Sequence, residues 1–216
     1  MENKNIKREV WSKFLRENKE VIDKIQKRAA DIHASVNQTY DEMPYSFHTN
    51  MVSNIFMQFG HPCFMNSIFV TDDGLAVVFA SAFHDTIEDC RLTYNDVVKI
   101  AKEYMNERQA ILAADIVYAL TNEKGKTRAE RANEKYYEGI RETPYAPCVK
   151  LCDRYANALY ANARRSSMSG KYSKEMVEFI SHIAVDTYDV KYSLPEELVS
   201  LCMSYPLYRE ESNKEE

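Results

Sequence analysis

The stretch from Leu75 to Asp89 constrains the fold of this chain more than any other. Its apolar residues recur every three or four positions, which is the spacing of a helix with one buried face. These residues are Leu75, Val78, Phe79, Ala82, Phe83 and Ile87. Asp72 and Asp73 precede the stretch, where such a helix needs an N-cap. The sequence therefore predicts a core helix here, capped by an acidic residue.

Similar apolar spacing recurs along the rest of the chain. No segment shows the alternation of apolar and polar residues that is typical of a half-buried strand. The 216 residues contain only five Gly and six Pro, and 45% of them are hydrophobic, which is enough to bury one full core. We therefore expect an all-α, single-domain fold of about eight to ten helices. Residues 1–24 are expected to form an N-terminal helical extension, residues 25–207 the domain and residues 208–216 a charged flexible tail.

Four ionisable residues stand close together at the C-terminal end of the predicted core helix: His84, Asp85, Glu88 and Asp89. Residues four apart on a helix lie one above the other, so His84 is expected below Glu88, and Asp85 below Asp89. An imidazole nitrogen and a carboxylate oxygen from adjacent positions can bind one divalent ion, and carboxylates one turn away can hold a water molecule beside it. The alternative is a solvated helix end in which a neighbouring carboxylate satisfies His84.

Two other predicted helices contain residues that suit the same ion. His48 is expected in the first turn of a helix from about residue 44 to Gly60. Asp153 and Asn157, four residues apart, share a face beside the buried stripe of a helix that follows Pro147. A histidine satisfied within the core and a surface ion pair are the alternatives for His48 and Asp153. Since each helix has an apolar stripe toward one core, we expect four side chains to converge on a metal ion: His48, His84, Asp85 and Asp153.

A row of basic residues lies on the helix predicted over residues 127–139. Arg128, Arg131 and Lys135 are spaced three and four residues apart and share one face. Such a row is most often a solvated helix face; alternatively, it forms an edge that attracts a phosphate group.

Charge and cysteine usage restrict the partners and the compartment. The formal net charge of −5 and the isoelectric point near 5.7 argue against binding to a nucleic-acid polymer or a membrane surface. No apolar run approaches the length of a membrane-spanning helix, and the N-terminal MENKNIKREVW is polar, without an apolar signal region. The five cysteines show no paired C-x-x-C spacing, which favours reduced thiols. A cytoplasmic protein is therefore expected.

The order of the candidate ligands resembles that of the HD superfamily of metal-dependent phosphohydrolases. The segment MPYSFH, ending at His48, resembles the PYxxH element of the RelA/SpoT-type alarmone hydrolases, and HDTIED, from His84 to Asp89, resembles their HDxxED motif. KLCDRYAN, from Lys150 to Asn157, resembles their KLADRxxN helix. The segment from Thr121 to Asp153 is similar to that of the stand-alone hydrolases of the metazoan SpoT-homologue type.

This resemblance implies an HD-type helical fold over residues 25–207 and one bound Mn²⁺ per chain, with other divalent transition metals as alternatives. It implies hydrolysis of the 3′-pyrophosphate of guanosine tetra- or pentaphosphate, the alarmones of the stringent response, with release of pyrophosphate. Glu88 and Asp89 would orient and deprotonate the attacking water, and Asn157 would lie against the ribose or a phosphate. The residues that would hold the metal are His48, His84, Asp85 and Asp153. The partner is then a small nucleotide, and the oligomeric state stays open.

One segment departs from the family pattern. Before PYxxH the family usually has a basic, glycine-containing loop, HxGQxRKxGxPY, whose Arg and Lys help to hold the base and the phosphates. The corresponding segment here, from His33 to Met43, contains no Arg, Lys or Gly, while Asp41 and Glu42 add negative charge. Tyr40 offers a ring that can stack on a base instead.

The altered loop leaves two alternatives beside the alarmone hydrolase. One is an HD-type phosphohydrolase that acts on another phosphorylated nucleotide, because the contacts to guanine and to the phosphates are changed. The other is a non-catalytic regulator that binds a nucleotide or a metal. The presence of Glu88 and Asp89, which handle water in the resemblance, argues against the regulator.

Overall fold

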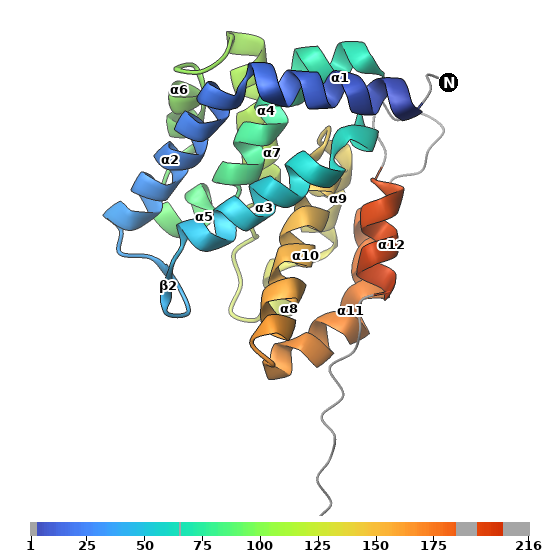
Figure 1. The fold of residues 1–216 in the computed structure, drawn as a ribbon. Helices are drawn as coiled ribbons and strands as arrows, with labels where there is room; N and C mark the ends of the chain where they lie inside the picture. The colour runs from blue at the N-terminus through green and yellow to red at the C-terminus, as the bar shows by residue number, and fades with distance from the viewer. Residues whose placement is uncertain (1–3, 65, 185–193, 205–216) are drawn as a thin grey trace, which may run out of the picture.

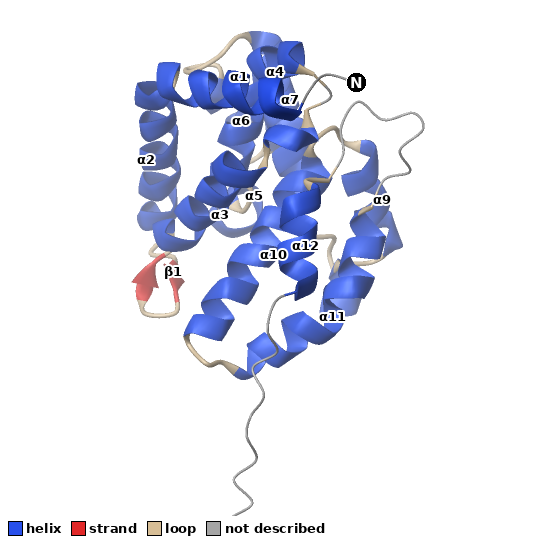
Figure 2. Ribbon diagram, turned by 45° about the vertical axis from the view of Figure 1, so that its right-hand side comes forward, coloured by secondary structure: helices blue, strands red, loops and turns tan. Residues whose placement is uncertain are grey.

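The computed structural model describes residues 4–64, 66–184 and 194–204 of the chain. Within these residues the protein is all-α apart from one small hairpin, so the predicted fold class is confirmed (Figures 1 and 2). The elements are α1 (Lys4–Glu17), α2 (Lys19–Ser35), β1 (Thr39–Tyr40), β2 (Met43–Pro44), α3 (Ser46–Phe59), η1 (His61–Cys63), α4 (Ser67–Phe83), α5 (Thr86–Cys90), α6 (Tyr94–Ala101), α7 (Glu107–Leu120), α8 (Arg128–Arg131), α9 (Glu134–Glu142), α10 (Ala146–Ala163), α11 (Ser167–Ile183) and α12 (Glu196–Ser204).

Helix α4 lies at the centre of the core. Every residue of the segment 75–83 is buried, and a helix buried on all sides is expected to be apolar all round. Helices α1, α2, α3, α7 and α10 pack around it. Trp11 and Phe14 of α1 stack on each other next to Gly74, where a Cβ would come within 3.0 Å of the Phe14 ring. Helix α1, which the sequence assigned to an extension, therefore contributes to the same core.

The helix predicted through Leu75–Asp89 is not continuous. Helix α4 ends at Phe83, His84 and Asp85 form a turn, and α5 begins at Thr86. Asp85 has φ −99° and ψ 0°, in the sparsely populated bridge region. The prediction of one helix was therefore wrong here: the two candidate ligands lie on the turn between α4 and α5.

The start of α4 was also predicted wrongly. The side chain of Asn66 caps the helix by accepting hydrogen bonds from two backbone N–H groups of the first turn, so neither Asp72 nor Asp73 is the N-cap. Asp73 instead lies inside the helix and is buried. It accepts a hydrogen bond of 2.7 Å from the Tyr145 hydroxyl and another of 2.7 Å from the Arg108 guanidinium. These bonds satisfy the carboxylate and join α4 to α7 and to the N-cap residue of α10.

Two further differences concern local structure. The helix predicted over residues 127–139 is divided into α8 and α9, because Asn133 caps α9 by accepting a hydrogen bond from the backbone N–H of Tyr136. Together with the turn at His84, this division makes the helices more numerous than the about eight to ten expected. The hairpin β1–β2 was not predicted, because strands of two residues are too short to show an alternating pattern.

The site is positioned by the packing of three segments. Helix α3 packs against α4, and α10 packs against both of them, so the C-terminal end of α4 lies near α3 and α10 (Figure 1). Helices α9, α11 and α12 also pack against α10. The hairpin projects from the connection between α2 and α3, as Figure 2 shows.

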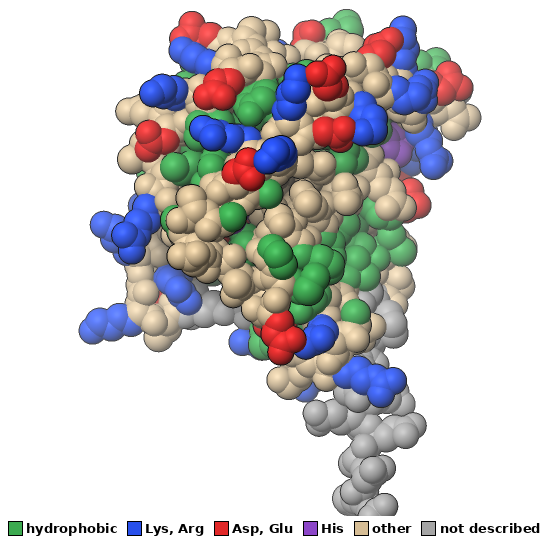
Figure 3. Space-filling view, turned by 60° about the vertical axis from the view of Figure 1, so that its left-hand side comes forward, with side chains coloured by type: hydrophobic (Ala, Val, Ile, Leu, Met, Phe, Trp, Pro, Cys, Tyr) green, Lys and Arg blue, Asp and Glu red, His purple; other side chains and the backbone are tan. Residues whose placement is uncertain are grey.

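The surface has mixed charge. Figure 3 shows one face of the molecule, on which basic and acidic side chains are interspersed. Along α2, ion pairs one turn apart join Lys19 to Asp23 and Lys24 to Glu20. In the part of the chain that the structure describes, no helix is both long and apolar enough to cross a membrane. The charged tail expected over residues 208–216 lies outside the described residues.

Candidate metal centre

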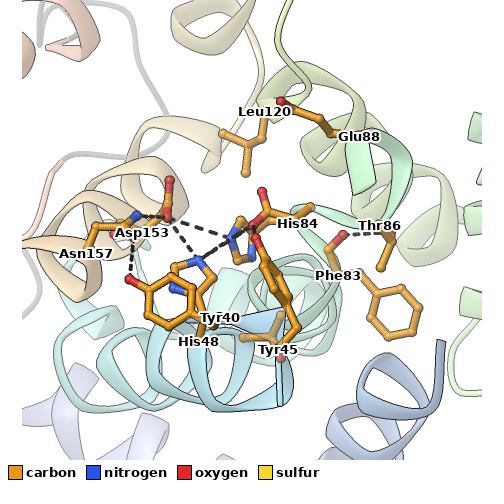
Figure 4. Close-up of polar contacts among 12 residues, drawn as sticks. Tyr40, Tyr45, His48, Phe83, His84, Thr86, Glu88, Leu120, Asp153 and Asn157 are labelled. Atoms are coloured by element: carbon orange, nitrogen blue, oxygen red, sulfur yellow. Dashed lines mark hydrogen bonds and ion pairs between the residues drawn. The ribbon is translucent and has the colours of Figure 1, made fainter. Parts of the chain in front are cut away.

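Four side chains from three segments meet at one point. His48 comes from α3, His84 from the turn between α4 and α5, and Asp153 from α10, and these three form a group that could hold a metal ion (Figure 4). Asp85, on the same turn as His84, lies beside them. The two imidazole Nε2 atoms are 3.2 Å apart. Asp153 Oδ1 lies 3.3 Å from Nε2 of His48 and 3.8 Å from Nε2 of His84. Asp85 Oδ2 lies 3.0 Å from Nε2 of His84 and 3.6 Å from Nε2 of His48. The structure thus brings together all four predicted ligands.

These distances fit the coordination of a single ion. Two atoms that are each about 2.1 Å from one ion, at angles of about 90–110°, lie about 3.0–3.4 Å from each other. The distances between the imidazole nitrogens and the carboxylate oxygens range from 3.0 to 3.8 Å, close to these values. A mixed set of imidazole and carboxylate donors suits manganese, iron or zinc. The residues therefore fit a divalent transition metal, without selecting among these.

The tautomer of His84 also favours metal binding. Its Nδ1 lies 3.0 Å from the backbone oxygen of Ser81, and a carbonyl oxygen only accepts hydrogen bonds, so Nδ1 is assigned the proton. In the neutral imidazole, Nε2 then has the lone pair, which is directed at His48 and the two carboxylates. Histidines that ligate a metal through one ring nitrogen commonly donate the N–H of the other ring nitrogen to a backbone carbonyl, which fixes the tautomer.

The pKa values show that the cluster attracts positive charge. Burial by itself would lower the pKa of His48, but hydrogen bonds to Asp153 and Asp85, together with their charges, raise it to about 9. Burial opposes ionisation of Asp153, yet the Lys150 ammonium and His48 hold its pKa below the usual range. Without a metal, a proton on His48 supplies positive charge, and a bound cation would displace that proton.

Side chains behind the ligands hold the carboxylates in place. The Tyr45 hydroxyl donates a hydrogen bond of 2.6 Å to Asp85 Oδ2. Lys150 Nζ donates to Asp153 Oδ2 at 3.0 Å, and Asn157 Nδ2 donates to Asp153 Oδ1 at 2.7 Å. Neither Tyr45 nor Lys150 was assigned a role from the sequence. The signal for Lys150 was its spacing of three residues before Asp153, which places both on the same helical face, whereas Tyr45 reaches Asp85 on another segment.

Replacing Tyr45 by Phe is expected to weaken metal binding by about 10–100-fold, because Asp85 loses the hydrogen bond that orients it. The dissociation constant is to be measured by competition with a chelator. Tyr94→Phe is the matched control, since the Tyr94 hydroxyl donates a similar bond of 2.8 Å to Asp115 on the surface. Equal metal affinity in the Tyr45→Phe and Tyr94→Phe variants would show that Tyr45 does not position the ligand.

The two predicted catalytic acids lie in different surroundings. Glu88 is exposed and accepts hydrogen bonds of 2.9 and 3.0 Å from Nδ2 of Asn122. Asp89 is half-buried and lies near the side chains of Tyr45 and Gln38. Burial, together with the negative charge of Asp85, raises the pKa of Asp89. Asp89 thus lies next to the Tyr45–Asp85 pair, while Glu88 faces Asn122.

The predicted substrate-binding residues are only partly brought together. Tyr40 stacks on His48 with ring centroids 4.8 Å apart, and its hydroxyl donates a hydrogen bond of 2.8 Å to Asn157 Oδ1 (Figure 4). A cavity of ≈ 580 Å³ lies beside Asp153, and Asn157, Glu88 and Arg131 are among the residues that line it.

The rest of the predicted basic row lies elsewhere. Lys135 pairs with Glu123 at 3.0 Å and lines a separate hollow. The side chain of Arg128 is outside the described part of the structure. The three basic residues do not share one helix face, because α8 ends at Arg131 and α9 begins at Glu134.

The chain was compared with family models, curated proteins and solved structures. No family model, curated protein or solved structure matches the chain. The function is therefore inferred from the four converging ligands, the residues that hold them and the adjacent cavity.

Proposed function

We propose that this protein is a divalent-metal-dependent phosphohydrolase of the HD type. The observation that supports the proposal is that two carboxylate oxygens each lie 3.0–3.8 Å from two imidazole nitrogens, in the order along the chain that the HD resemblance implies. The proposed ligands are His48, His84 and Asp153, which form one group, and Asp85, whose Oδ2 lies 3.0 Å from Nε2 of His84. A cavity large enough for a small molecule adjoins them, and its lining includes basic side chains.

The residues of the site have separate roles in this proposal. When bound, the ion supplies Lewis-acid chemistry by withdrawing charge from phosphate oxygens. Asp89, whose pKa is raised by burial and by Asp85, is the group that accepts a proton from the attacking water. Glu88, held by Asn122 at the cavity, orients that water. Lys150 and Asn157 keep Asp153 in position.

The resemblance supplies one candidate substrate, guanosine tetra- or pentaphosphate, with Mn²⁺ as the metal. A specific observation favours the second candidate, another phosphorylated nucleotide. The ring of Tyr40 occupies the hairpin side of the metal centre and is fixed there by His48 and Asn157. The Arg and Lys of the family loop have no counterpart in this hairpin, which instead contains Asp41 and Glu42.

The proposal is tested by loading the purified protein with Mn²⁺ and incubating it with a panel of phosphorylated nucleotides. We expect release of orthophosphate or pyrophosphate from at least one compound, lost on chelation and restored by adding metal. Separating the two products shows which bond is cleaved. Nucleotide binding without any release across the panel would contradict the hydrolase and favour a regulator.

A further inference from the structure

The cavity beside the metal centre has the size and walls of a nucleoside site. Its volume of ≈ 580 Å³ lies within the range of about 300–1,000 Å³ that is typical of small-molecule pockets. Tyr137 of α9 and Tyr172 of α11 are among its aromatic lining residues, and Asp153 of α10 links it to the metal centre. Flat aromatic side chains suit the ring system of a nucleoside.

The charges that line the cavity nearly balance. The basic residues are Arg131, Lys150 and Arg154, and the carboxylates are Glu88, Asp153, Glu175 and Glu178. Lys150 pairs with Asp153 at 3.0 Å, and Arg154 pairs with Glu175 at 2.9 Å. Arg131 forms no ion pair with any residue that the structure describes. One basic side chain is therefore available to a ligand in addition to the metal.

The opposite side of the metal centre is closed by Tyr40. Its ring lies 4.8 Å from that of His48 and 4.6 Å from that of Tyr160, and its hydroxyl bonds to Asn157. Tyr40 is not part of the cavity lining. A nucleotide with two diphosphate groups needs space and positive charge for both, whereas the cavity beside Asp153 has, among the described residues that line it, Arg131 as its basic side chain without an ion pair.

We infer that the substrate is a nucleoside-sized phosphomonoester with a single phosphate group, bound between α9 and α11 with Arg131 and the metal centre at its phosphate. This inference rests on the proposed function and names its substrate class. A phosphomonoester has about −1.5 to −2 charges at neutral pH, which the ion and Arg131 can balance. Any further phosphates would lie in a cavity lined by Glu175 and Glu178.

The reaction that follows is the hydrolysis of a phosphate ester. The oxygen of water bonds to phosphorus, the bond between phosphorus and the ester oxygen breaks, and the ester oxygen leaves with a proton as an alcohol. The products are a nucleoside and orthophosphate. Pyrophosphate, which the alarmone reaction releases, is not formed.

The test compares substrates on the Mn²⁺-loaded wild-type protein. Nucleoside 3′- and 5′-monophosphates and guanosine tetraphosphate are assayed separately for released orthophosphate and pyrophosphate. We expect kcat/KM for the best monophosphate to exceed that for the tetraphosphate by at least about tenfold. A higher kcat/KM for the tetraphosphate would overturn the inference and leave the hydrolase proposal standing, whereas no hydrolysis of any compound would overturn the hydrolase proposal itself.

A pair of variants tests whether the substrate binds in this cavity. Arg131→Ala is expected to raise KM for the preferred monophosphate by about tenfold or more with little change in kcat, because a charge-assisted contact is lost. Lys135→Ala also removes one positive charge, but Lys135 pairs with Glu123 and lies outside this cavity. The KM of the Lys135→Ala variant is therefore expected to stay within about twofold of wild type. Equal changes in the two variants would show that the ligand does not bind in this cavity.

Discussion

Replacing Asp85 by Ala is expected to abolish stable metal binding, and with it all hydrolysis. Asp85 Oδ2 is 3.0 Å from Nε2 of His84, and Tyr45 holds it there through a bond of 2.6 Å. Without this carboxylate, the remaining ligands have one negative charge instead of two, and the Tyr45 hydroxyl loses its acceptor. Elemental analysis is expected to find about one ion per wild-type chain and only a small fraction of that in the variant.

The control for this experiment is Asp115→Ala. Asp115 also accepts a hydrogen bond from a tyrosine, Tyr94, but lies away from the metal centre, so its loss should leave the metal content unchanged. Circular dichroism is to confirm that both variants remain folded. Wild-type metal content in folded Asp85→Ala would show that Asp85 is not a ligand.

The convergence of the candidate ligands was predictable from the sequence because apolar periodicity determines which side of each helix faces the core. His48 and Asp153 stand beside such stripes, and α3 and α10 pack together through them. The turn at His84 was not predictable in this way. Ile87 continues the apolar spacing beyond Phe83, so the pattern resembles one unbroken helix even though the backbone bends between them.

Lys150 and Asn157 hold Asp153 from the same helix, but other contacts of the site join distant segments, which spacing along one helix does not reveal. Tyr45 reaches Asp85 across 40 positions of sequence, and Asn122 reaches Glu88 across 34. Asp73 was mistaken for an N-cap because a buried carboxylate and a capping one look alike in sequence. Its partners, Tyr145 and Arg108, are identified only by the packing of α4.

The combined substitution Glu88→Gln and Asp89→Asn is expected to reduce turnover by at least about a hundredfold while metal binding is retained. Neither side chain is among the four ligands, and both substitutions nearly preserve shape. Asp89→Asn alone is expected to account for most of the loss, because Asp89 lies against the Tyr45–Asp85 pair, whereas Glu88 is exposed. Single-turnover rates and metal content are to be measured for the double variant and for each single variant.

A stability measurement separates this catalytic role from a structural one. The raised pKa of Asp89 means that folding disfavours its charged form, so the carboxylate destabilises the metal-free protein at neutral pH. Asp89→Asn is therefore expected to keep or raise the thermal midpoint of the metal-free protein while it removes activity. If Asp89 had a structural role instead, Asp89→Asn would lower the thermal midpoint, and the variant would keep its activity at temperatures below that midpoint. Turnover within a few-fold of wild type in the double variant would show that neither acid handles the water.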